Sequence, residues 1–171
     1  DVFKSTDGGI NWGPPVPSFG GDKNWMVIDQ SGGPSSGLIY GIWQRFAACC
    51  GTSVFTRSTN GSASYQTPVP VTRWPTFGTM DVGPDGEVYA AGIDGTFEQD
   101  VNTFVVSRSD DAKLPAVTPT FSGVVAELDG AMVFGGPNPD GLLGQANVVV
   151  DRSSGPTRGN VYLLASVDPF S

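Results

Sequence analysis

The sequence predicts an all-β protein built from a repeated unit of four antiparallel strands. Glycine and proline, 24 and 14 of the 171 residues, divide the chain into short segments, while 39% of residues are apolar and can form a packed core. Apolar residues nowhere recur at helical spacing, so no helix is expected. A serine-led turn recurs at Ser5, Ser58 and Ser109, at spacings of 53 and 51 residues, and sets the length of the unit.

The length of the repeat indicates the architecture. Four short strands in about 50 residues is the spacing of β-propeller blades. Residues 1–20 are predicted to be the outer half of one blade, 21–72 and 73–122 two full blades, and 123–171 an insertion and the inner half of the next. About three blades' worth of strands would then form a single partial propeller domain. Such a domain needs the rest of a propeller or neighbouring chains to close it.

Within the first full blade, strands are expected at 25–29, 38–43, 53–57 and 65–71. The stretch from Trp25 to Ile28 is continuously apolar, which predicts a strand buried on both faces. Pro68 and Pro70 favour an outer edge strand that makes few ladder bonds. Residues 146–164 repeat the pattern of 25–43, and both copies separate an aspartate from a tyrosine by 11 residues.

The opening turn reads Ser-x-Asp-x-Gly-x-x-Trp, from Ser5 to Trp12. Ser5 and Asp7 can bond nearby backbone groups, and Gly9 can supply the positive φ of a tight hairpin. Trp12 is expected to begin the return strand and to bury its ring.

Two weaker copies of the turn follow. The second has asparagine and tyrosine in place of aspartate and tryptophan, and the third is expected to lack both the glycine and the aromatic residue. Because their predicted role is to hold hairpins, these residues are interpreted as structural: Ser58, Asn60, Tyr65, Ser109 and Asp111.

Charge and composition exclude several classes of function. The net charge of −8, with no basic cluster, argues against a nucleic-acid partner. No apolar run approaches the roughly 20 residues of a membrane-spanning helix. The absence of histidine excludes His-based metal sites and Ser-His or Cys-His catalysis within these residues. The adjacent Cys49 and Cys50 are either two small buried residues or a vicinal disulfide, which would imply an oxidising compartment.

Residues Ser5 to Trp12 resemble the Asp box, also called the BNR repeat, of sialidases and their relatives. The stretch Asp22-Lys23-Asn24-Trp25 and the Ser-Gly-Pro units are also similar to secreted sialidase-like proteins. The resemblance covers nearly the whole chain. It implies a parent propeller of about six or seven blades and a secreted or cell-surface protein with a carbohydrate or glycoprotein partner. The sequence begins in what reads as the middle of a strand. Two interpretations are left open, the removal of a leader peptide and a sequence that is a fragment of a longer protein.

Two functions follow from that resemblance. The first is a glycoside hydrolase of exo-sialidase type, which hydrolyses terminal glycosidic bonds with much of its site outside these residues. The second is a non-catalytic propeller that binds glycans or proteins. Whether the chain is an enzyme is left open, because the same box occurs in both classes and fold does not imply function.

A sialidase needs three arginines around the substrate carboxylate, a tyrosine activated by a glutamate, and an aspartate. The Arg-Ile-Pro sequence that usually carries the first arginine is absent. Arg57 and Arg108 precede boxes, and the tyrosines at repeat positions are expected to pack: Tyr40, Tyr89 and Tyr162. No nucleophile is assigned.

The best single catalytic candidate is Asp22, in the loop that enters an inner strand, with Lys23 and Trp25 as candidate substrate-binding neighbours. The alternative is that this loop only packs the entrance of the blade. Asp94, Glu98 and Asp100 form an acidic loop that could hold Ca²⁺ or simply be solvated. No other cofactor is expected.

Overall fold

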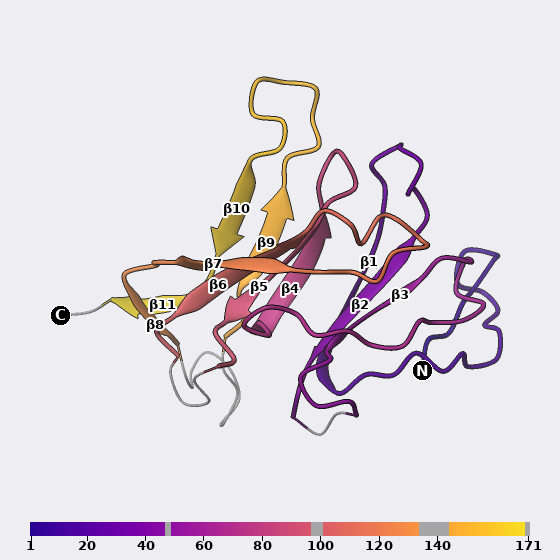
Figure 1. The fold of residues 1–171 in the computed structure, drawn as a ribbon, viewed down its shortest axis with the longest axis horizontal. Coiled ribbons are helices and arrows are strands. Elements are labelled where there is room, and N and C mark those ends of the chain that lie inside the picture. The colour runs from indigo at the N-terminus through magenta and orange to yellow at the C-terminus, as the bar shows by residue number, and fades with distance from the viewer. Residues whose placement is uncertain (47–48, 97–100, 134–143, 170–171) are drawn as a thin grey trace.

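The all-β prediction is confirmed. A computed structural model describes residues 1–46, 49–96, 101–133 and 144–169, and the regular elements in these ranges are strands, with no helix. The main sheets follow one another along the longest axis of the molecule, and the N-terminus and β11 lie at opposite sides of it (Figure 1).

The strands are short and rich in β-branched and aromatic residues, which suit a pleated, half-buried surface. In chain order they are β1 (Asp22–Ile28), β2 (Ile39–Gln44), β3 (Phe55–Ser58), β4 (Thr76–Val82), β5 (Val88–Ile93), β6 (Phe104–Ser109), β7 (Ser122–Ala126), β8 (Gly130–Met132), β9 (Asn147–Val150), β10 (Val161–Leu164) and β11 (Val167–Pro169).

All strand pairs are antiparallel. The first sheet has the order β1-β2-β3, and the second has the order β4-β5-β6-β7. Strands β9 and β10 form a separate pair, as do β8 and β11. Within the described residues, successive strands of the first and second sheets are therefore neighbours, as short connections require, whereas β8 and β11 pair across the intervening β9 and β10.

The three inner hairpins share one register. A tyrosine of the second strand lies opposite the residue two places before the turn, in the pairs Val27–Tyr40, Asp81–Tyr89 and Val149–Tyr162. On the third strand, Arg57 lies opposite Tyr40 and Arg108 lies opposite Tyr89. The sequence repeat is therefore also a repeat of strand pairing.

The outer strands differ in length. In the first sheet, pairing beyond β3 is reduced to a single bridge, in which Phe55 and Val69 exchange backbone hydrogen bonds of 3.2 and 2.9 Å. Val2 and Val16 make the same bridge 53 residues earlier, with two bonds of 2.9 Å. Prolines flank both outer valines and lack the N–H group that a longer ladder needs. The second sheet completes the unit with a full strand, β7.

Each of the first two sheets begins with the same irregularity. The register shifts between Asp22 and Trp25 in β1, and between Thr76 and Thr79 in β4. Lys23 has a φ of 50° within the first of these bulges. Phe77 holds the same place in the second, with a φ of 51°. The left-handed backbone at Lys23 therefore belongs to the repeated unit rather than to a unique site.

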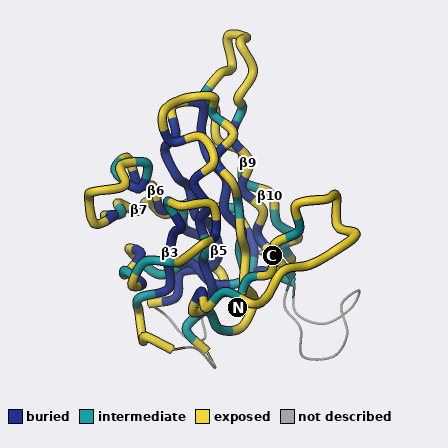
Figure 2. The backbone as a smooth tube through the Cα atoms, turned by 90° about the vertical axis from the view of Figure 1, so that its right-hand side faces the viewer, coloured by how far each residue is buried: buried dark blue, intermediate teal, exposed yellow. Residues whose placement is uncertain are grey.

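The main core lies between the first and second sheets. Tyr40, Phe55, Met80, Val82 and Val88 are buried there and belong to one apolar cluster. Figure 2 shows buried residues along the central strands and exposed residues mainly in the loops.

The expectation that β1 is buried on both faces is wrong. Met26 is 51% exposed and Ile28 is 45% exposed, whereas the equivalent β4 residues Met80 and Val82 are buried. The reason is the number of neighbours, because β4 packs against both β1 and β9.

The insertion predicted at the start of residues 123–171 contains most of β7 and all of β8. The fourth strand of the second sheet extends to Ala126, past the expected boundary at residue 122. The glycine-rich part of the insertion, 135–141, lies outside the described residues.

Candidate functional site

The first box is a closed hydrogen-bond circuit. Ser5 Oγ donates to Asp7 Oδ1 at 2.8 Å and accepts from the Gly9 N–H at 2.8 Å. Asp7 accepts from the backbone N–H and the side-chain amide of Asn11, at 2.9 and 2.7 Å. Trp12 Nε1 donates to the Gly9 carbonyl at 3.1 Å, so the ring caps the turn and is 63% exposed. The expectation that this ring is buried is wrong.

The second box makes the same circuit with a neutral side chain. Ser58 Oγ donates to Asn60 Oδ1 at 2.9 Å and accepts from the Ser62 N–H at 2.9 Å. Asn60 Oδ1 accepts from the Ser64 N–H at 3.0 Å, and its Nδ2 donates to Ser64 Oγ at 2.9 Å. Tyr65 takes the place of Trp12, and its hydroxyl lies 3.0 Å from Ser62 Oγ. Asn60 therefore substitutes for an aspartate through its amide.

The third box also holds its aspartate by hydrogen bonds, but additional residues separate the aspartate from one of its donors. Asp111 accepts from Ser109 Oγ at 2.8 Å and from the backbone N–H and hydroxyl of Thr120, at 2.8 and 2.6 Å. Thr120 donates its backbone N–H to Asp111 as Asn11 donates its own to Asp7, but Thr120 lies nine residues after the aspartate instead of four. The next residue, Phe121, packs edge-on against Phe55 at 4.9 Å between ring centroids. The prediction that this copy lacks its aromatic residue is wrong.

The carboxylates of the boxes are committed to their turns. Hydrogen bonds from the backbone and side chain of Asn11, then from Ser5, lower the pKa of Asp7 to about 2. Burial acts to raise the pKa of Asp111, but bonds from Thr120 and Ser109 outweigh it, and the pKa is lowered. A general acid needs the opposite shift. These residues are suited to holding hairpins.

Arg57 holds the interruption of the third box. Its Nε donates to Gln66 Oε1 at 2.7 Å, and its terminal nitrogens donate to the carbonyls of Ala112, Pro115 and Val117. The residue is 1% exposed, and burial lowers the pKa of its guanidinium. Arg57 therefore joins two sheets and is not accessible to a ligand carboxylate.

The opposite end of the sheets carries the predicted site residues. We call residues 19–23, 44–46, 73–75 and 94–96 the loop end. Asp22 begins β1 and pairs with Gln44, which ends β2, and Gln44 Nε2 donates to Asp22 Oδ2 at 3.2 Å. The Lys23 ammonium lies 3.9 Å from Asp22 Oδ1. The Asp22 N–H donates to the Phe46 carbonyl at 3.3 Å, so the two loops lie together.

Aromatic rings and cations alternate along the loop end. The Arg45 guanidinium lies 5.6 Å from the ring centroids of both Phe46 and Trp74. Beside Trp74, Arg73 forms an ion pair with Asp94. Rings and cations are thus held next to one another at the ends of β2, β4 and β5, and the backbone bond from Asp22 to Phe46 joins them to the start of β1.

Trp25 lies apart from Asp22 and Lys23. It lines a crevice of about 130 Å³ between the N-terminal segment and the first sheet, together with Phe19 and Met26, whereas Asp22 and Lys23 do not line it. Ligand pockets usually enclose about 300–1,000 Å³. The three predicted neighbours are therefore not brought to one surface.

The calcium prediction stays a prediction. Asp94 is fully buried, and its carboxylate accepts from the backbone N–H and hydroxyl of Thr96, at 2.9 and 2.6 Å, besides pairing with Arg73. Glu98 and Asp100 lie outside the described residues. In the part of the chain that the structure describes, no three acidic or cysteine side chains are grouped as metal ligands.

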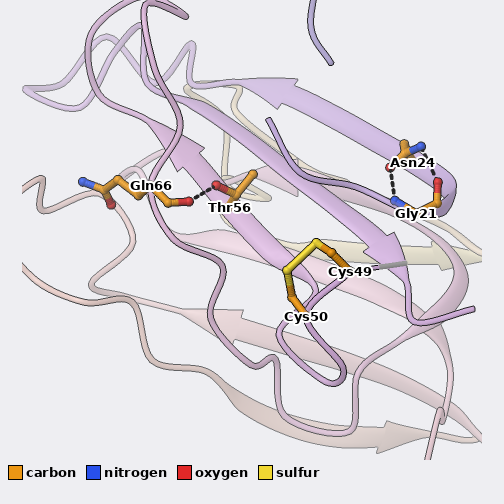
Figure 3. Close-up of a disulfide and its surroundings, with 6 residues drawn as sticks. All are labelled: Gly21, Asn24, Cys49, Cys50, Thr56 and Gln66. Carbon is orange, nitrogen blue, oxygen red and sulfur yellow. Dashed lines mark hydrogen bonds between the residues drawn. A yellow bond between two sulfur atoms is a disulfide. The ribbon is translucent and has the colours of Figure 1, made fainter. Parts of the chain in front are cut away.

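Cys49 and Cys50 form a vicinal disulfide, on the connection between β2 and β3 (Figure 3). Both residues are exposed, so the alternative of two small buried residues is wrong. Near them, the Asn24 side chain fixes the entry to β1 by bonding the N–H and carbonyl of Gly21, at 3.1 and 2.7 Å. The disulfide lies on the connection that follows residues 44–46 of the loop end.

Three further arginines lie next to aspartates. Arg108 pairs with Asp110, and Arg152 pairs with Asp81. Arg158 lies 3.6 Å from Asp85. Burial raises the pKa of Tyr40, which is fully buried, and also that of Tyr89. The described residues therefore do not assemble three arginines around an accessible tyrosine.

Comparison with known proteins places no relative beside this chain. No family model, curated protein or solved structure matches it. In the described ranges, no helix has the length and apolar character needed to cross a membrane.

Proposed function

We propose that the chain is part of a secreted Asp-box β-propeller whose loop end binds carbohydrate. The observation that carries the proposal is the alternation of rings and cations there, with Arg45 between Phe46 and Trp74 and the Asp22–Lys23 pair beside them. Aromatic rings offer apolar contact area, and arginine and lysine offer hydrogen-bond donors, which together suit a sugar with its apolar ring face and its hydroxyl groups. The exposed disulfide at the same end supports an oxidising, extracellular setting.

The three boxes support the propeller arrangement. Each circuit follows a strand that pairs in the same register or makes the same bridge, and β4 lies between β1 and β9 as an inner strand lies between its neighbours in a ring. The boxes and the loop end are at opposite ends of the strands, so the scaffold and the binding surface are separate.

Binding of 3′-sialyllactose, lactose and cellotetraose, measured by titration calorimetry, tests the proposal. Phe46, 45% exposed, is the residue to change. We expect Phe46→Ala to weaken the preferred sugar by about tenfold, the loss of one ring contact. Trp12→Ala is the matched control, because Trp12 is exposed at the box end and should leave affinity unchanged. Equal losses in both variants, or no binding of any of the three sugars, would overturn the proposal.

Hydrolysis of terminal sialosides is the second candidate, and the box circuits favour it because sialidases share them. It needs arginines and a tyrosine–glutamate pair in addition to those described. Incubation with a fluorogenic sialoside distinguishes the two: release of the fluorophore makes the chain a hydrolase, and binding without release makes it a non-catalytic module.

A further inference from the structure

The second box contains an asparagine that is followed by a glycine. Among the asparagines of the sequence, only Asn60 has such a neighbour. Gly61 has no side chain to shield its backbone nitrogen, and no atom beyond its chain neighbours lies within 4 Å of the place where a Cβ would stand. Within the described residues, the Gly61 N–H forms no hydrogen bond. This nitrogen is therefore unhindered and available to react with the Asn60 side chain.

The box polarises the side-chain amide of Asn60. Its Oδ1 accepts three hydrogen bonds, from Ser58 Oγ at 2.9 Å and from the backbone N–H groups of Ala63 and Ser64 at 3.1 and 3.0 Å. Attack by a nitrogen on Cγ moves negative charge onto this oxygen. Donors that are already in place around such an oxygen lower the barrier to the charged intermediate. The bonds that hold the hairpin therefore also favour attack at Asn60 Cγ.

The third box shows the same circuit closed around a carboxylate. The Thr120 hydroxyl donates to Asp111 Oδ2 at 2.6 Å. In the second box, Ser64 Oγ takes the place of this hydroxyl, but it accepts from Asn60 Nδ2 at 2.9 Å. A hydroxyl group can donate as well as accept, so a turn of the Ser64 O–H satisfies an oxygen placed at the Nδ2 position. Replacing the amide nitrogen by oxygen therefore keeps the circuit closed.

We propose that Asn60 is a site of spontaneous deamidation, which converts the neutral second box into an anionic one. In the first step, Gly61 N gives its proton to water and bonds to Asn60 Cγ, and the Cγ–Nδ2 bond breaks as Nδ2 takes up a proton and leaves as ammonia. Water then adds to Cγ of the resulting succinimide ring, the bond from Cγ to Gly61 N breaks, and Gly61 N regains a proton. One water is consumed, one ammonia is released, and the acid formed ionises. The proposal rests on the box circuits and not on sugar binding.

The circuit also determines which product persists. Water can open the succinimide at Cγ, which gives aspartate, or at the main-chain carbonyl, which gives isoaspartate. Isoaspartate has a longer main chain and a shorter side chain and cannot reproduce the bonds of the box, so the folded state favours aspartate. Asp7 illustrates why aspartate does not close the ring again, since it too precedes a glycine. Bonds from Asn11 and then Ser5 lower the pKa of Asp7 to about 2, and an ionised carboxylate resists attack by nitrogen.

Mass spectrometry of peptides from the folded chain, aged at mildly alkaline pH, tests the proposal. We expect Asn60 to gain the mass that replaces an amide NH2 by OH about tenfold faster than Asn11, a difference in barrier of about 1.4 kcal/mol. Asn11 is the matched control, because it lies in the first box but is followed by Trp12. The aged chain should co-elute on ion exchange with Asn60→Asp, which carries the product charge from the start. Equal rates at the two asparagines overturn the proposal.

The ratio of the two products tests the role of the circuit. Peptides with aspartate and isoaspartate separate by chromatography, and an isoaspartyl methyltransferase labels isoaspartate. We expect aspartate to predominate in the folded chain, and the share of isoaspartate to rise several-fold in chain unfolded by guanidinium chloride, where the circuit is absent. An equal share in the two states contradicts selection of aspartate by the box. At neutral pH, Asn60→Asp should keep the urea midpoint of the unmodified chain, and a lower midpoint would show that the second box does not hold a carboxylate.

Discussion

The first and second sheets repeat one pattern of pairing in two different surroundings. Met26 and Met80 hold the same position, as do Arg57 and Arg108, yet one member of each pair is buried and the other is exposed. Local pairing is set by the repeat, whereas burial is set by the elements that lie alongside. The comparison predicts that equivalent substitutions have unequal costs.

Arg57 and Arg108 should differ most. Arg57→Ala removes the donors that satisfy the carbonyl of Ala112 in a buried setting and the carbonyls of Pro115 and Val117 in a partly buried one. Each unsatisfied buried acceptor costs about 1–3 kcal/mol, and these losses do not add fully, so we expect about 3–5 kcal/mol of unfolding free energy to be lost. Arg108→Ala breaks an exposed pair with Asp110 and should cost about 1 kcal/mol or less.

Urea denaturation of both variants measures the difference. Similar midpoints would mean that the loop held by Arg57 relaxes and finds other donors. Arg57→Lys separates charge from geometry, because one ammonium cannot reach all of the groups that the planar guanidinium bonds. It should restore only part of the loss.

The second largest difference in unfolding free energy is expected between alanine variants of Met80 and Met26. Met80→Ala opens a cavity in the main core, where methionine-to-alanine changes cost about 2–5 kcal/mol, and we expect about 3 kcal/mol. Met26→Ala removes an exposed side chain and should cost about 1 kcal/mol or less in dilute solution. The free energies of unfolding from urea titrations check this, and equal costs would show that β1 is covered even in the single chain.

The features that could be predicted from the sequence are those set by residues close together in the chain. The absence of helix, the hairpins at 25–43 and 146–164, and the serine-led turns all follow from composition, spacing and turn chemistry, and they are present. It failed where tertiary neighbours decide. An apolar run does not say how many strands flank it, so β1 was predicted to be buried.

The site was less predictable than the fold. Phe121 was missed because an interruption separates it from Asp111, although Thr120-Phe121 repeats the polar–aromatic order of Asn11-Trp12 and Ser64-Tyr65. The loop end joins segments 20 or more residues apart, such as Asp22 with Gln44, and no sequence spacing brings Arg45 between Phe46 and Trp74. Asp22 and Lys23 were found from their place at the start of a strand, but the bulge between Asp22 and Trp25 breaks the alternation of side chains, and Trp25 lines another surface.

The smallest expected effect is a difference in pH dependence between the first box and the second. Asp7 titrates and Asn60 does not, although both close the same circuit. The pKa of Asp7 is lowered from 3.8 to about 2 in the fold, so its contribution to stability is present above pH 3.8 and is lost as the pH falls towards 2. The amide resonance of Asn11, followed by NMR from pH 6 downward, should therefore stay constant to about pH 3 and then move. The Ser64 amide should show no such step of its own, and Asp7→Asn should make the first box behave like the second. A step in the Asn11 resonance near pH 4 would mean that the circuit does not stabilise the carboxylate.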